Sequence, residues 1–308
     1  MLKKGILIII LSFSLIAPVS VSALSMPQTG SELAEMSGVS AKAYVVVNTE
    51  TGEVLVAKNE NDLRVPASLT KLVTALVVLD TKPKLSKAVA ITAADQTAGS
   101  CSSGGACIKA KAGVKFTVDG LFHAALIPSA NNAANALARS TGLSSEKFVS
   151  LMNEKVKALG AINTKFNEPT GMDSGNVTTA ADYAKIVTAA FNNKYLKNIS
   201  SKEKYTLRSS NNFRYTQVIK NTDKLLADED INIIGAKTGY LDESQYNFAA
   251  MASYKNGPKL AIVVLGEAHL YSAFAETKLL ASMADDAQML ALIYNQPSVL
   301  GTSTGVGK

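Results

Sequence analysis

The strand-like segments of this 308-residue chain lie near its two ends, with a helical region between them. Near the start, Ala43–Asn48 and Glu53–Ala57 flank a turn-forming stretch and predict a β-hairpin. Near the end, three apolar runs predict further strands: Ile231–Gly239, Asn247–Ala252 and Lys259–Leu265. Antiparallel pairing of the first and last strands would gather them into one sheet of about five strands.

The middle of the chain has helical periodicity. Two helices are expected to start near Ser68, just after Pro66, and after Pro128. Four more are expected at Thr117–Leu126, 144–159, 179–192 and 272–294. Residues 85–116 resemble short strands and loops. The expected architecture is α/β, of the α+β type, with helices on both faces of the sheet and a helical middle subdomain.

The first 23 residues have the pattern of an export signal. Lys3 and Lys4 precede the apolar run Ile6–Ile16, and Val21-Ser22-Ala23 fits a small-residue cleavage site. An uncleaved membrane anchor is the alternative, although the run is short for a complete span. We therefore expect a signal peptide at 1–23, a lead-in at 24–40, a domain at 41–295 and a disordered tail at 296–308. The domain is expected to be exported to the periplasm or another extracytoplasmic cell-wall space.

Composition excludes several classes of protein. The chain is 47% hydrophobic and 18% charged, with a net charge of +6. These values do not fit a disordered, collagen-like, coiled-coil or polytopic membrane protein. The lysines are scattered rather than interleaved with aromatic residues along a stripe, so we expect no nucleic-acid partner.

Cysteine and histidine are scarce, and this limits the available chemistry. The two cysteines, Cys101 and Cys107, lie in a Gly/Ser-rich stretch without a neighbouring histidine and make a poor metal site. In an oxidising compartment a disulfide between them is expected, with two free thiols as the alternative. The two histidines, His123 and His269, are in neither a zinc-peptidase motif nor a recognisable catalytic triad. We expect no metal and no cofactor, and a base other than histidine for any hydrolysis.

Ser68 and Lys71 form the S-x-x-K pattern with the most suitable surroundings. At this spacing both side chains project from one face of a helix. The rest of the expected helix is almost entirely apolar, and burial disfavours a charged lysine, so Lys71 could act as a base toward Ser68. A simple helix cap is the alternative for Ser68. Ser144–Lys147 and Ser201–Lys204 have the same spacing, but their polar surroundings predict solvated lysines.

Two further patterns follow in the chain. Ser129 and Asn131 lie in an S-x-N turn between two apolar helices. The competing S-x-N at Ser174–Asn176 lies in a polar turn and is interpreted as a connection. The only K-T-G run is Lys237-Thr238-Gly239, followed by Tyr240. An amine and a hydroxyl at a strand edge suit recognition of a carboxylate or phosphate, and glycine permits close backbone approach.

These three motifs, in this order, resemble those of the penicillin-recognising serine enzymes, with a β-lactamase/transpeptidase-like fold. Within that group the chain is similar to the low-molecular-mass penicillin-binding proteins, the serine D-alanyl-D-alanine carboxypeptidases. The resemblance runs from about Ala41 to Leu290. The segments that carry it are Val65–Leu72, Thr117–Ala138 and Lys237–Tyr240 with the hairpin that follows.

The resemblance implies a role for each motif residue. Ser68 would be the nucleophile, Lys71 its base, and Ser129 the relay of a proton to the leaving D-alanine. Asn131 would hold Lys71 and the substrate amide, and Lys237 and Thr238 would bind the terminal carboxylate. Gly239 would admit the substrate backbone, and the backbone N–H groups of Ser68 and Tyr240 would form the oxyanion hole. The implied partners are peptidoglycan stem peptides and covalent β-lactam inhibitors, with a membrane only if the leader is uncleaved.

Three alternatives remain. Phe166–Gly171 resembles a segment of the DD-endopeptidase branch, so cleavage of peptide cross-links is open. A class A β-lactamase would need a Glu-x-x-Leu-Asn element, which Glu168 and the residues after it do not form, and Glu168 is interpreted as structural. A non-catalytic cell-wall-binding module on the same fold is the third alternative.

Overall fold

The computed structural model describes residues 38–211, 215–254 and 257–294. The expected signal peptide (1–23), most of the expected lead-in (24–37) and the expected disordered tail (296–308) lie outside these residues. Those three assignments therefore stay predictions. Among the described residues, no helix combines the length and apolar character needed to cross a membrane.

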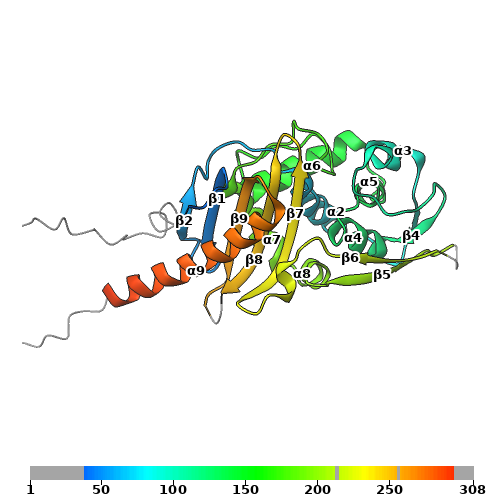
Figure 1. Ribbon diagram of the computed structural model, residues 1–308. Coiled ribbons are helices and arrows are strands. Elements are labelled where there is room, and N and C mark those ends of the chain that lie inside the picture. Colours follow the sequence, from blue (N-terminus) through cyan, green and yellow to red (C-terminus); the bar gives the residue numbers. More distant parts are fainter. Residues whose placement is uncertain (1–37, 212–214, 255–256, 295–308) are drawn as a thin grey trace, which may run out of the picture.

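A five-stranded antiparallel sheet joins the two ends of the described chain (Figure 1). Its strands, in spatial order, are β2 (Val54–Lys58), β1 (Ala43–Asn48), β9 (Leu260–Glu267), β8 (Gln245–Tyr254) and β7 (Ile231–Leu241). The first strand pairs with the last, so that Ala43 lies opposite Leu265 and Asn48 opposite Leu260. This confirms the predicted sheet and the predicted pairing of its terminal strands.

Both faces of the sheet are buried, because apolar residues occupy both sides of its central strands. In β9, Val263 and Leu265 belong to one hydrophobic core, whereas Ile262 and Val264 belong to another. This alternation follows from the two-residue period of a strand. Helix α9 (Leu270–Tyr294) covers one face, and α7 (Ala180–Asn192) packs on the other (Figure 1).

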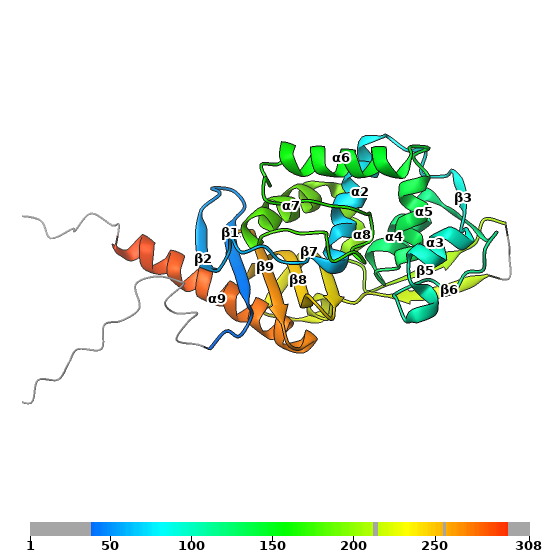
Figure 2. The same ribbon diagram turned by 90° about the horizontal axis from the view of Figure 1, so that it is seen from above.

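Most of the helical region lies beside the β7 edge of the sheet (Figure 2). Its helices are α2 (Lys71–Asp80), α3 (Ala93–Ala98), α4 (Val118–Leu126), α5 (Asn131–Arg139), α6 (Ser145–Ala158) and α8 (Lys194–Ser200). It also contains the short 3-10 helices η1 (Ala67–Thr70) and η2 (Cys101–Ser103), and a third, η3 (Leu225–Ala227), follows it before β7. Two small hairpins complete it: β3 (Ala88–Ala90) with β4 (Lys115–Thr117), and β5 (Lys204–Arg208) with β6 (Thr216–Lys220).

Three of the predicted helices begin where a hydroxyl can cap them. Thr117, Ser144 and Thr179 each accept a hydrogen bond from the backbone N–H three residues later. Such a cap satisfies one of the donors that a helix start leaves free. The starts of α4, α6 and α7 were therefore readable from the sequence.

The sequence predictions were wrong or silent at three places. The predicted helix at Ser68 begins with the tighter turn η1, so Ser68 lies just before α2. Residues 85–116 contain a helix, α3, which a reciprocal capping box between Thr92 and Asp95 defines. Its six residues are too few to show an apolar period. Helix α8 and the polar β5–β6 hairpin were not predicted.

Candidate active site

Ser68 lies in the turn η1, where several backbones converge. Ala67 has φ +49°, a left-handed conformation, and places Ser68 at the edge of a cavity of about 420 Å³. A Cβ atom on Gly239 would lie 2.7 Å from Pro66 O, and one on Gly171 would lie 1.8 Å from Ala67 O. Only glycine at these two positions lets β7 and the 168–172 loop come this close to the serine turn.

Lys71 is directly bonded to Ser68. Its Nζ lies 2.7 Å from Ser68 Oγ and 2.6 Å from Thr170 O, and the side chain is buried. Burial lowers the pKa of Lys71 from its usual value of 10.5 to about 7, while the negative charge of Glu168 opposes that fall. A substantial fraction of Lys71 is therefore neutral near pH 7 and able to accept a proton from Ser68.

The loop that carries Thr170 is organised by Glu168. Its carboxylate accepts hydrogen bonds from the backbone N–H groups of Thr170, Gly171 and Met172, and from the Asn176 side chain. Glu168 is half-buried. These contacts agree with the expectation that Glu168 has a structural role. It orders the loop whose carbonyl contacts Lys71.

Ser129 and Lys237 form a second pair. Ser129 lies in the connection from α4 to α5 with φ +64°, and Lys237 lies on β7. Lys237 Nζ lies 2.7 Å from Ser129 Oγ and 2.8 Å from Thr238 O. Burial lowers the pKa of Lys237 well below its usual value, and the charge of Lys71 lowers it further. The two buried amines therefore resist being protonated together.

The K-T-G strand forms one side of the cavity. Thr238, Gly239 and Tyr240 line it together with Ser68, Ser129 and Asn131. Thr238 Oγ1 lies 2.6 Å from the hydroxyl of Thr222, a residue that the sequence analysis did not single out. The structure thus gathers at one cavity the three motifs singled out from the sequence.

The contacts of Asn131 differ from the implied ones. Its side-chain Nδ2 donates to Gly99 O at 3.0 Å, and its Oδ1 is buried with no hydrogen-bond partner in the part of the chain that the structure describes. The contacts of Lys71 are instead with Ser68 and Thr170. Cys101 and Cys107 are joined by a disulfide bond, and the loop between them lines the same cavity.

The other two S-x-x-K motifs lie away from this arrangement, whereas the competing S-x-N motif supports it. Ser144 caps α6, and Lys147 is exposed beside Glu154. Lys204 is exposed on β5. Asn176 is buried, and its Nδ2 donates to Thr70 Oγ1 at 3.2 Å and to Glu168 Oε1 at 2.9 Å, so it joins the serine turn to the 168–172 loop. Among the described residues, no three His, Cys, Asp or Glu side chains are grouped so that they could hold a metal ion.

The fold and this histidine-free serine–lysine pair define a class, the penicillin-recognising serine enzymes, and comparisons with known proteins agree. The family model described as D-alanyl-D-alanine carboxypeptidase matches residues 29–269. The chain is 31% identical to a D-alanyl-D-alanine endopeptidase of Pseudomonas aeruginosa, over 92% of this chain and 89% of that protein. It is also 31% identical to a D-alanyl-D-alanine carboxypeptidase of Bacillus subtilis, over 77% of this chain and 60% of that protein.

A solved structure supports the same assignment. The crystal structure of the Streptomyces K15 DD-transpeptidase superposes with a TM-score of 0.75 at 26% identity, covering 80% of this chain and 98% of that one. The chain belongs to the D-alanyl-D-alanine carboxypeptidase family of serine peptidases. This confirms the family, fold class and enzyme class predicted from the sequence.

Proposed function

We propose that this protein hydrolyses the D-alanyl-D-alanine end of peptidoglycan stem peptides through an acyl-enzyme on Ser68. The observation that carries the proposal is the 2.7 Å contact between Ser68 Oγ and the buried Lys71 Nζ, at the cavity that the K-T-G strand lines. Neutral Lys71 takes the hydroxyl proton as Ser68 Oγ bonds to the carbonyl carbon of the penultimate D-alanine. The peptide bond then breaks, and the terminal D-alanine leaves after gaining a proton.

Ser129 is the proposed proton relay to the leaving amine. Its hydroxyl is within hydrogen-bond distance of Lys237, so a proton can move between them without a large rearrangement. Water then attacks the acyl-enzyme, and Ser68 recovers its proton as the shortened peptide leaves. The backbone N–H groups of Ser68 and Tyr240 are the proposed donors to the oxyanion.

Lys237 and Thr238 are the proposed binding pair for the terminal carboxylate. The Thr222 hydroxyl holds that of Thr238 at 2.6 Å, which limits its orientation. A bound carboxylate would favour protonated Lys237 and so offset the cost of burying its charge. Asn131 is the proposed partner of the substrate amide, because it lines the cavity and its Oδ1 has no hydrogen-bond partner among the described residues.

Cleavage of peptide cross-links is the second candidate. Two relatives named D-alanyl-D-alanine endopeptidase are each 31% identical to this chain, and they align with it over 80% and 89% of their own lengths. The segment Phe166–Gly171, noted for its resemblance to that branch, forms the Glu168-centred loop next to Lys71. Both reactions use the same acyl-enzyme and differ in the leaving group.

Two less favoured functions make distinct predictions. A β-lactamase needs a base for deacylating water, but Glu168 directs its carboxylate to the backbone of its own loop. A non-catalytic binding module would not need Ser68 bonded to the buried Lys71. Rapid turnover of penicillin would favour the first function, and failure of penicillin to attach covalently would favour the second. We also propose that β-lactams acylate Ser68 and that the protein acts outside the cytoplasm.

Digestion of purified peptidoglycan tests the proposal. The full-length protein is incubated with cross-linked muropeptides, with Ser68→Ala as the matched control, and the masses of the products are measured by mass spectrometry. Loss of one D-alanine per stem peptide identifies the carboxypeptidase, and separation of cross-linked dimers identifies the endopeptidase. Unchanged muropeptides with the wild-type protein would contradict both.

A further inference from the structure

The loop closed by the Cys101–Cys107 disulfide forms one wall of the candidate active site. Ser103, Gly104, Gly105 and Ala106 line the cavity that Ser68 also lines. The disulfide holds the two stems of this loop together, with 5.7 Å between the Cα atoms of the cysteines. None of the roles proposed above uses this loop.

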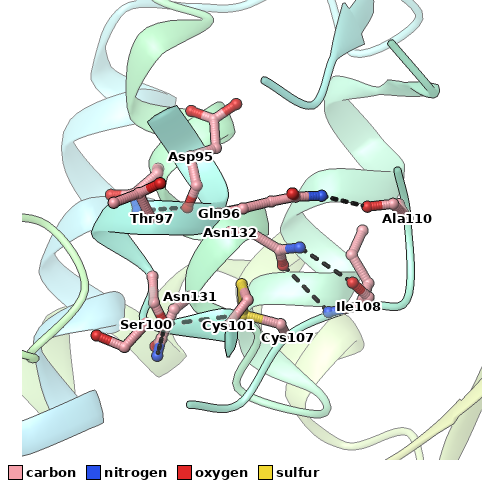
Figure 3. The surroundings of a disulfide bond; sticks show 12 residues. Asp95, Gln96, Thr97, Ser100, Cys101, Cys107, Ile108, Ala110, Asn131 and Asn132 are labelled. Carbon is pink, nitrogen blue, oxygen red and sulfur yellow. Dashed lines mark hydrogen bonds between the residues drawn. A yellow bond between two sulfur atoms is a disulfide. The ribbon is translucent and has the colours of Figure 1, made fainter. Parts of the chain in front are cut away.

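Both stems of the loop contact Asn131. On the outgoing stem, Ala106 O accepts the backbone N–H of Asn131 at 2.6 Å. On the incoming stem, Gly99 O accepts a hydrogen bond from Asn131 Nδ2 at 3.0 Å. The neighbouring Asn132 binds the N–H and the carbonyl of Ile108 at 3.1 and 3.0 Å (Figure 3). The start of α5 is therefore clamped between the two stems.

The backbone contact replaces a missing helix cap. Helix α5 begins at Asn131, and its cap residue, Ala130, has no side chain that could accept a hydrogen bond. Ala106 O takes one of the backbone donors that a helix start leaves free. The loop thus fixes the end of the helix that presents Asn131 to the cavity.

The side-chain contact sets the direction of the Asn131 amide. With Nδ2 on Gly99 O, Oδ1 must point elsewhere, and it is buried with no partner among residues 38–211, 215–254 and 257–294. An unpaired buried acceptor is costly, so a substrate N–H that reaches it gains more than it would in water. The loop packs closely here, since a Cβ atom on Gly105 would lie 2.5 Å from Gly99 O and 3.2 Å from Asn131 Nδ2.

We infer that the Cys101–Cys107 disulfide is a positioning device for Asn131. It keeps both stems at the spacing at which Gly99 O and Ala106 O bind Asn131 together, so that the Asn131 side chain is held in one orientation at the cavity. A dithiol such as dithiothreitol supplies two electrons and two protons, becomes a cyclic disulfide, and leaves Cys101 and Cys107 as thiols. The stems then separate, and acylation of Ser68 slows. This inference rests on the proposed function.

The test compares acylation by a fluorescent penicillin in the oxidised protein, the dithiothreitol-reduced protein and a Cys101→Ser/Cys107→Ser variant. Reduction and the double substitution should each slow acylation about tenfold to a hundredfold, as expected when a reacting group is misplaced by about an ångström. Dithiothreitol should not affect the double variant. Thermal melting of each sample shows whether it is folded.

Asn131→Ala tests whether the disulfide acts by positioning Asn131 or by ordering the whole 101–107 loop. If the disulfide acts through Asn131, reduction should slow acylation of Asn131→Ala by less than twofold, because the two changes remove the same interaction. Should the double cysteine variant fail to fold, Gly105→Ala crowds the stems with the disulfide intact and should slow acylation similarly. Ser102→Ala, an exposed position in the same loop, should not.

The inference is overturned if reduced wild-type protein is acylated at the oxidised rate. It is also overturned if reduction slows Asn131→Ala as much as it slows the wild type. Absence of labelling in the oxidised wild-type protein would instead overturn the proposed function, and with it this inference.

Discussion

The pH dependence of acylation is the sharpest consequence of the buried Lys71. Burial lowers its pKa to about 7, and only the neutral amine can take the proton of Ser68. Acylation should therefore be slow at low pH, rise through pH 7 and become constant above it. A solvated lysine would leave acylation rising up to about pH 10.

The size of the effect follows from the fraction of neutral Lys71. With a pKa of about 7, roughly one molecule in eleven has the neutral amine at pH 6, and roughly ten in eleven have it at pH 8. The second-order rate constant for acylation should thus rise about tenfold between these values. At pH 7 the neutral fraction is about one half, against roughly one in three thousand for a lysine with the usual pKa of 10.5.

Stopped-flow labelling with a fluorescent penicillin in excess measures this rate constant from pH 5 to pH 9. Glu168→Gln provides a second perturbation, because the negative charge of Glu168 raises the pKa of Lys71. Its removal should move the midpoint to lower pH. The matched control is Glu154→Gln, an exposed glutamate on α6 that should leave the midpoint unchanged.

Two results would refute this reasoning. A rate constant that is flat from pH 5 to pH 9 would mean that Lys71 is not the titrating base. A midpoint that moves to higher pH in Glu168→Gln would mean that the charge of Glu168 does not act on Lys71 as the structure indicates.

Three further predictions concern the rest of the site. Gly171→Ala should abolish penicillin labelling and lower the melting temperature, since its Cβ would lie 1.8 Å from Ala67 O; an unchanged melting temperature would contradict the close approach. Thr222→Val should lower kcat/KM for a peptide with a free terminal carboxylate about fivefold, or ~1 kcal/mol, because the hydrogen bond to Thr238 is lost. In the same steady-state assay, kcat/KM for that peptide with its carboxylate amidated should not change. Binding of a carboxylate peptide should raise the lowered pKa of Lys237 and so take up a proton; calorimetry from pH 6 to pH 10 in buffers of different ionisation enthalpy measures this uptake, and an enthalpy independent of buffer throughout that range would oppose it.

The central sheet was predictable because its signals are local. The central strands β1 and β9 are short runs that are apolar on both faces, and the pairing of Ala43–Asn48 with the last strand follows from burying both. The hydroxyl caps at Thr117 and Thr179 likewise mark helix starts from sequence. Helix α3 was missed because six residues cannot show a helical period.

The motif residues of the site were predictable, but the groups that support them were not. Ser68 and Lys71 have a recognisable spacing, whereas Thr170 acts through its backbone carbonyl, which any residue has. Thr222 is sixteen residues from Thr238, and its polar neighbours give no local signal. The direction of the Asn131 amide depends on a loop that returns from 32 residues earlier in the chain.

Mass spectrometry of the penicillin-treated protein tests the central claim most directly. The full-length chain is incubated with benzylpenicillin, digested, and searched for the peptide that carries the added mass. The account predicts one adduct per molecule on Ser68, and none in a folded Ser68→Ala variant. An adduct on another serine, or no adduct on the folded wild-type protein, would contradict it.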